Sequence, residues 1–259
     1  MQSFSITVMA LLLAHLLGDF PLQPRWIVAR KGKNLPALLW HGAIHYLLAL
    51  ICLQIFSQVP ALSIRVQAIL IVYLFAHLII DKIRSRLVAL KPSRDNAGFF
   101  LIDQSLHLAT LTIAASFLAR VSISDFMGSI RISETTKAQV LATAIVYIFV
   151  VFGGGYLIRL ITKGMARESE RRTAEQLGNA GMYIGWIERF LVVTAMVLQS
   201  PALVGLILTG KSIARYPEFK EARFAEYFLI GTLLSISLAV LGGIVLLQVL
   251  YGTVSLKSS

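Results

Sequence analysis

Long apolar runs constrain this sequence more than any other feature. The stretch between Lys137 and Arg159 and the stretch from Tyr227 to Leu256 contain no charged side chain. A helix needs about 20 mostly apolar residues to cross the hydrocarbon core of a bilayer. The composition, 57% hydrophobic and 14% charged, excludes an ordinary soluble globule, and a single cysteine, Cys52, excludes a disulfide framework. We therefore predict a membrane protein.

Eight apolar runs divide the chain into candidate spans. They lie at about residues 4–20, 36–57, 67–81, 98–119, 138–159, 181–199, 202–214 and 226–251. The expected fold class is all-α, a polytopic transmembrane helical bundle with eight spans, or seven if the short seventh run is re-entrant. We expect three parts: a four-span bundle at 1–120; an external loop, the fifth span and a cytoplasmic amphipathic helix near 163–178 within 121–180; and a three-span module at 181–259.

The basic residues predict the orientation of these spans. The net charge is +11, and the lysines and arginines concentrate in the loops after the first, third, fifth and seventh runs. Cytoplasmic loops of membrane proteins carry such an excess, so we expect these loops to be cytoplasmic and both termini to lie outside. The same reasoning assigns the positive charge to topology and anionic lipid rather than to nucleic acid.

All five histidines fall in the first four runs, and each has a polar partner four residues away. The pairs are His15 with Asp19, His41 with His45, His77 with Asp81, and Asp103 with His107. Residues four apart share one face of a helix, about 6 Å apart along its axis. Allowing for alternating chain direction, we expect a deeper layer of four histidines and a shallower layer of Asp19, His41, Asp81 and Asp103.

Imidazole and carboxylate side chains together are typical ligands of zinc, manganese and non-haem iron. We therefore predict that the eight residues bind a divalent metal, two ions of Zn, Mn or Fe, with Gln23 and Gln104 as hydrogen-bonding partners of the ligands. Two other interpretations stay open. The residues could hydrogen-bond across helices without a metal, or two of the histidines could hold a b-type haem.

The motifs in this region resemble those of a known family. They read Leu12-Leu13-Ala14-His15-Leu16-Leu17-Gly18-Asp19-Phe20, then Gln23 and Trp26, His41-Gly42-Ala43-Ile44-His45, His77-Leu78-Ile79-Ile80-Asp81 and Asp103-Gln104-Ser105-Leu106-His107. Over about residues 11–120 the sequence resembles the uncharacterised bacterial family called domain of unknown function 3307. That resemblance implies an integral protein of the bacterial inner membrane and no established activity. A looser resemblance, in residue type only, is to inner-membrane metal-dependent hydrolases.

The second half of the chain carries a smaller set of ionisable residues at the predicted cytoplasmic ends of its spans. They are Glu188, Arg189, Lys211, Arg215 and Glu226. One interpretation is a site that binds a phosphate or carboxylate of the substrate. The other is ordinary interfacial ion pairing.

These features favour a metal-dependent hydrolase of a lipid-linked or amphipathic substrate that enters from the cytoplasmic leaflet. Asp103 is the expected proton acceptor, and the metal would activate a water molecule. The alternatives are a divalent-cation or proton transporter, a non-haem di-iron oxygenase, a haem protein, and a structural membrane subunit. Membrane lipid is an expected partner, and the sequence leaves the oligomeric state open.

Overall fold

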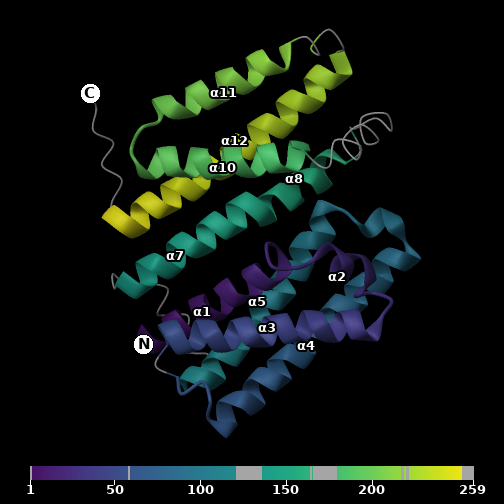
Figure 1. The fold of residues 1–259 in the computed structure, drawn as a ribbon, viewed down its shortest axis with the longest axis vertical. Coiled ribbons are helices and arrows are strands. Elements are labelled where there is room, and N and C mark those ends of the chain that lie inside the picture. Colours follow the sequence, from purple (N-terminus) through teal and green to yellow (C-terminus); the bar gives the residue numbers. More distant parts are fainter. Residues whose placement is uncertain are drawn as a thin grey trace. The chain divides into compact units, whose positions relative to one another are not determined.

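The computed structural model describes residues 2–57, 59–120, 136–163, 165, 180–216, 219 and 222–252, and all regular structure in these ranges is helical. Figure 1 shows the helices in chain order. They are α1 (Gln2–Asp19), α2 (Arg25–Arg30), α3 (Leu35–Phe56), α4 (Ile64–Leu90), η1 (Pro92–Arg94), α5 (Ala97–Ala119), α7 (Thr136–Ile148), η2 (Phe149–Gly153), α8 (Gly154–Thr162), α10 (Ala180–Val197), α11 (Ala202–Ala214) and α12 (Ala222–Tyr251). The all-α prediction is confirmed.

To within two residues at their ends, the eight apolar runs lie in helical segments, and the fifth run extends over α7, η2 and α8 in succession. Five helical segments of the described chain are long and apolar enough to cross a membrane. They span Leu35–Phe56, Ile64–Leu90, Ala97–Ala119, Thr136–Thr162 and Phe224–Tyr251, and two shorter apolar helices span Phe4–Asp19 and Ala202–Ala214. The third run covers only about residues 67–81, but α4 continues through the charged residues that follow this run to Leu90. The predicted external loop (121–135) and most of the predicted amphipathic helix near 163–178 lie outside the described residues.

Local sequence signals set the helix boundaries near the site. The side chains of Asn34, Ser63 and Asn96 accept hydrogen bonds from backbone N–H groups in the first turns of α3, α4 and α5. These caps satisfy donors that have no partner within the helix. Pro92 follows directly after the Lys91 cap of α4 and cannot continue the helix.

The chain divides into two compact units, Met1–Ile145 and Val146–Ser259. In the first unit, α1 packs against α3 and α5, and α4 packs against the same two helices, so the four form a closed ring. Each helix contributes one fully buried leucine to the interior of the unit: Leu11, Leu53, Leu70 and Leu111. The short helix α2 packs on α3 at the end of this ring.

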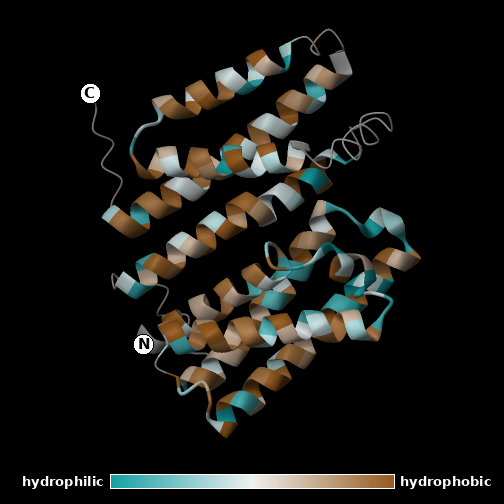
Figure 2. Cartoon of the chain, in the orientation of Figure 1, coloured by the Kyte–Doolittle hydropathy of each residue, from teal (hydrophilic) through white to brown (hydrophobic). Residues whose placement is uncertain are grey.

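The distribution of polarity in this unit is that of a membrane protein. The outward faces of α3 and α4 expose large apolar side chains, including Leu39, Ile51, Phe75 and Ile79. In contrast, the buried residues include all five histidines. Hydrophobic residues predominate along the helices in Figure 2, and hydrophilic residues gather around α2. Extensive exposed apolar surface over a polar interior needs lipid around it.

In the second unit, α10 packs against α12 and α11, and α8 and η2 pack against α10 and α12. Its core consists of Val150, Val192, Val193, Ala239 and Leu246. The segment η2 is a single π-helical turn between α7 and α8.

Candidate metal centre

The ring of four helices brings the eight predicted ligands into one cluster. His15 contacts the rings of His45, His77 and His107, with centroid distances of 5.7, 5.4 and 4.9 Å. His77 lies 4.1 Å from His45 and 4.4 Å from His107 by the same measure. These four are the histidines that helical spacing assigned to one layer, and every ligand except Asp19 is classed as buried.

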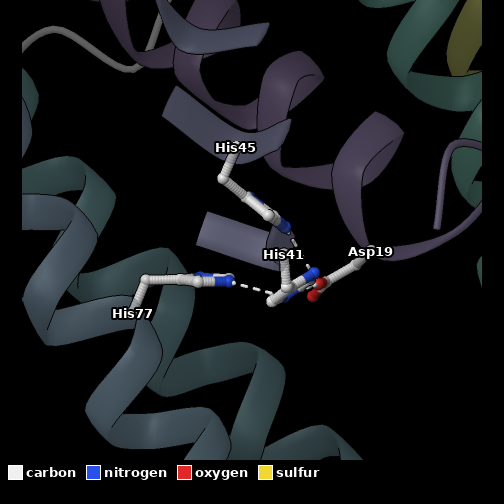
Figure 3. Close-up of side chains that lie close together, drawn as sticks. All are labelled: Asp19, His41, His45 and His77. Atoms are coloured by element: carbon white, nitrogen blue, oxygen red, sulfur yellow. Dashed lines mark hydrogen bonds and ion pairs between the residues drawn. The ribbon is translucent and has the colours of Figure 1, made fainter. Parts of the chain in front are cut away.

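Asp19, at the end of α1, is the first centre of contacts. Its Oδ1 lies 3.2 Å from His45 Nε2 and 3.4 Å from His41 Nε2, and its Oδ2 lies 3.5 Å from His15 Nε2. Figure 3 shows His41, His45 and His77 reaching toward this carboxylate from α3 and α4. Gly18 permits the approach, because a Cβ there would lie 2.6 Å from His45 Nε2.

Asp81, on α4, is the second centre. Its Oδ2 lies 2.8 Å from His41 Nε2 and 3.7 Å from His77 Nε2, and its Oδ1 lies 3.9 Å from His107 Nε2. Lys31 completes this environment by donating a hydrogen bond to Asp81 Oδ2 at 2.9 Å.

Asp103, on α5, lies at the edge of the cluster. Its Oδ2 accepts a hydrogen bond from Gln104 at 3.2 Å and lies 3.6 Å from Arg84 Nε, whereas its Oδ1 lies 3.8 Å from His107 Nε2. Within the described residues, this buried Oδ1 has no hydrogen-bond partner, and neither has either ring nitrogen of His107. Buried polar atoms of this kind call for an explanation, and an ion is one.

The two ring nitrogens of His41 face different partners. Nε2 lies 2.8 Å from Asp81 Oδ2, which accepts a hydrogen bond when Nε2 carries the proton, and 3.3 Å from Lys31 Nζ. Gln23 lies on the Nδ1 side of the ring. With its amide oxygen turned toward the ring, it accepts from His41 Nδ1 and from Lys31 Nζ, both at 3.0 Å, and its nitrogen donates to the carbonyl oxygen of Asp19.

Three sets of side chains could each hold a metal ion. They are Asp19 with His41, His45 and His77; His15 with His77 and His107; and Asp81 with Asp103 and His107. Within each set the ligand atoms lie within 4.8 Å of one another. The first and third sets share no residue, so the cluster has donors for two ions. Gln104 lies beside it, with its Oε1 3.4 Å from His15 Nε2.

Lys31 and Arg84 are the residues of this site that sequence reasoning missed, because both were counted as loop charges. Arg84 lies three residues after Asp81 on the same helical face, a spacing that could have identified it. Lys31 follows α2, where no periodicity applies. Burial lowers the pKa of Lys31, but the carboxylates of Asp81 and Asp19 outweigh this effect, so its pKa is raised and it carries a charge.

The residues expected to bind an anion lie in the second unit. Lys211 donates a hydrogen bond to Glu188 at 2.6 Å, which matches the ion-pair interpretation for these two residues. Arg189 is buried and donates to the carbonyl oxygen of Val151 in the π-helical turn and to Ser235. Arg215 caps the end of α11, and Glu226 is an exposed residue of α12. Their role toward an anion stays a prediction.

Comparisons with known proteins agree with the resemblance stated above. The profile of the family described as "Protein of unknown function (DUF3307)" matches residues 7–132, which include all eight predicted ligands. Neither the curated proteins nor the solved structures give a match, and the looser resemblance to metal-dependent hydrolases finds no support. Residues 7–132, the part of this chain that contains the His/Asp cluster, therefore match the model of the DUF3307 family of proteins of unknown function.

Proposed function

We propose that this chain is a membrane metalloprotein whose first unit binds divalent transition-metal ions in the His/Asp cluster. One observation carries the proposal: the eight side chains form three sets whose ligand atoms lie within 4.8 Å of one another. In these sets the buried Asp103 Oδ1 and both ring nitrogens of His107 have no hydrogen-bond partner among the described residues. A bound ion would supply the missing partner.

The charges of the cluster support the same proposal. Asp19, Asp81 and Asp103 bring three carboxylates into a buried site, and Lys31 and Arg84 contribute two positive charges at its edge. With neutral imidazoles, one negative charge is left uncompensated. Burying a charge without compensation is costly, so a divalent cation would stabilise the bundle.

The reaction that fits these residues best is hydrolysis of a phosphoester or acyl ester of a lipid-linked or amphipathic substrate. A bound divalent ion would supply a water molecule with a pKa lowered toward neutrality. Asp103 Oδ1, which has no hydrogen-bond partner among the described residues, would take a proton from this water. The water oxygen bonds to the phosphorus or acyl carbon, the ester bond breaks, and the leaving oxygen receives the proton.

Two of the alternatives receive less support from the geometry. A transporter needs a polar path beyond the cluster, whereas the same four helices bury the apolar side chains of Leu11, Leu53, Leu70 and Leu111. A haem would have to lie between the two histidines of the cluster that serve as its axial ligands. However, the neighbouring rings already contact one another, with centroids as close as 4.1 Å between His45 and His77.

Metal analysis of the purified protein tests the proposal. We expect up to two Zn, Mn or Fe ions per chain in the wild type, with most of the metal lost in His45→Ala and Asp81→Asn. Asp95→Asn removes the same charge outside the cluster and is expected to retain the metal. A wild-type protein without metal, together with unchanged stability of both cluster variants, would refute the proposal.

Activity assays then separate hydrolysis from transport. Chromogenic phosphoester and acyl-ester probes are expected to be cleaved by the loaded wild type. In Asp103→Asn the rate per bound ion is expected to fall by about 10²–10⁴-fold, the contribution typical of a general base. Uptake of Zn²⁺ into liposomes without any ester cleavage would favour the transporter instead.

A further inference from the structure

The ammonium group of Lys31 occupies a position in the cluster where a metal ion would bind. Its Nζ lies 2.9 Å from Asp81 Oδ2 and 3.3 Å from His41 Nε2, and it also reaches the amide oxygen of Gln23 at 3.0 Å. The carboxylate and the amide oxygen accept hydrogen bonds from it, and His41 belongs to one of the sets of metal donors. The side chain is only 13% exposed, although it comes from the turn between α2 and α3 at the end of the bundle.

The two independent sets of metal donors differ in the cations that already face them. Asp19, in the set with His41, His45 and His77, makes close contacts with imidazoles. In the set of Asp81, Asp103 and His107, Asp81 Oδ2 forms an ion pair with Lys31, and Asp103 Oδ2 lies beside Arg84. An ion that enters this second set must share these carboxylates with two positive charges at distances where repulsion is strong.

We propose that the ammonium group of Lys31 occupies the place of the second metal ion, so that the two ion positions are filled one after the other. This inference rests on the proposed function. The first ion enters the set of Asp19, His41, His45 and His77, where Lys31 Nζ lies 3.3 Å from His41 Nε2 but forms its ion pair with the carboxylate of the other set. The second ion enters the set of Asp81, Asp103 and His107 only when Lys31 Nζ leaves Asp81 Oδ2.

The fold allows this exchange without unfolding the loop. The turn is anchored on both sides of Lys31, by the buried Ile27 of α2 and by Gly32, where a Cβ would lie 2.9 Å from Ser85 Cβ of α4. The backbone can therefore stay in place while the four-carbon side chain swings toward water. Lysine suits this role because its compact ammonium group is readily hydrated and its stem is flexible.

Zinc titration of the purified full-length protein, with a competing chelator, tests the inference. We expect the wild type to bind the first ion more tightly than the second. Lys31→Met keeps a similar side-chain volume without the charge. It is expected to bind the second ion about 10- to 100-fold more tightly, because a charge-assisted hydrogen bond no longer competes. Lys33→Met, at an exposed position in the same turn, is the matched control and is expected to behave as wild type.

Chemical labelling of the wild type gives a second measurement that does not depend on a variant. An amine-reactive acylating reagent and mass spectrometry report the exposure of each lysine. Labelling of Lys31 is expected to rise as the second equivalent of Zn²⁺ binds, while labelling of Lys33 stays constant.

The possible failures are distinguishable. Two ions that bind equally to wild type and Lys31→Met, with constant labelling of Lys31, would overturn this inference and leave the proposed function intact. Weaker binding of the second ion by Lys31→Met would overturn it as well, because Lys31 would then support the ion. A wild type that binds no zinc would refute the proposed function itself.

Discussion

The substitution Gly18→Ala tests the geometry of the cluster with a single added methyl group. The new Cβ would lie 2.6 Å from His45 Nε2, 2.7 Å from Cε1 and 2.9 Å from Cδ2, whereas ordinary contacts begin at 3.4 Å. The ring must therefore move by about 0.8 Å. It cannot simply rotate away, because His41 and His77 lie against it with centroid distances of 4.4 and 4.1 Å.

Two magnitudes follow from this displacement. Overpacking of a buried site costs about 1–3 kcal/mol, and replacing a helical glycine by alanine returns about 0.5–1 kcal/mol, so we expect a net loss of up to about 2.5 kcal/mol in the free energy of unfolding. Metal–ligand distances tolerate only about 0.2 Å, so His45 would be lost as a ligand. Metal affinity is then expected to fall by at least about 10–100-fold, the usual effect of disturbing a ligand through a neighbour.

Thermal unfolding in detergent measures the first effect, and zinc titration with a competing chelator measures the second. Gly98→Ala is the control in the same unit, because its Cβ would meet only Asn96 Oδ1 at an ordinary 3.5 Å. If Gly18→Ala matched Gly98→Ala in both stability and affinity, the placement of His45 against α1 and its role as a ligand would both be refuted.

Three further predictions concern metal removal, pH and the second unit. A strong chelator is expected to lower the melting temperature, since a ligand at 100 times its Kd adds about 2.7 kcal/mol of stability; a melting temperature insensitive to chelator would contradict bound metal. Metal affinity is expected to weaken only as the pH falls from neutral to about 4, because protons compete for the imidazole nitrogens and burial disfavours the protonated rings; an affinity that stays constant down to this pH would contradict ligation by the histidines. Gly155→Ala would bring a methyl group onto Arg189 Nη2, which donates to Val151 in the π-helical turn, and is expected to lower stability by about 1–3 kcal/mol. Gly205→Ala, with open space around it, serves as its control in the same melting assay.

Sequence reasoning identified the helices because their signals are local. Apolar runs, capping residues such as Asn34 and Asn96, and Pro92 after α4 each act within a few residues along the chain. It also identified all eight residues of the cluster, because the i, i+4 spacing places each pair on one face and polar pairs are rare in apolar spans. The count of spans and their orientation stay predictions, since the structure contains no membrane.

Sequence reasoning could not predict the contacts between residues that lie far apart in the chain. Helical periodicity says which residues share a face, but it does not say which helix that face meets. Arg189 illustrates the limit: its placement near the end of a span suggested an anion site, yet the π-helical turn offers it a carbonyl oxygen across the second unit.

The sequence by itself determined that this chain is helical and membrane-like, and which side chains form its polar interior, because those properties follow from composition and local spacing. Only the tertiary structure decided how these side chains meet. Packing of α1 on α3 aims His41 and His45 at Asp19, and the turn after α2 brings Lys31 onto Asp81 from 50 residues away. No sequence pattern indicates the partner of a flexible lysine. The ion pair of Lys31 with Asp81 therefore depends on the fold and on the charges buried in the bundle.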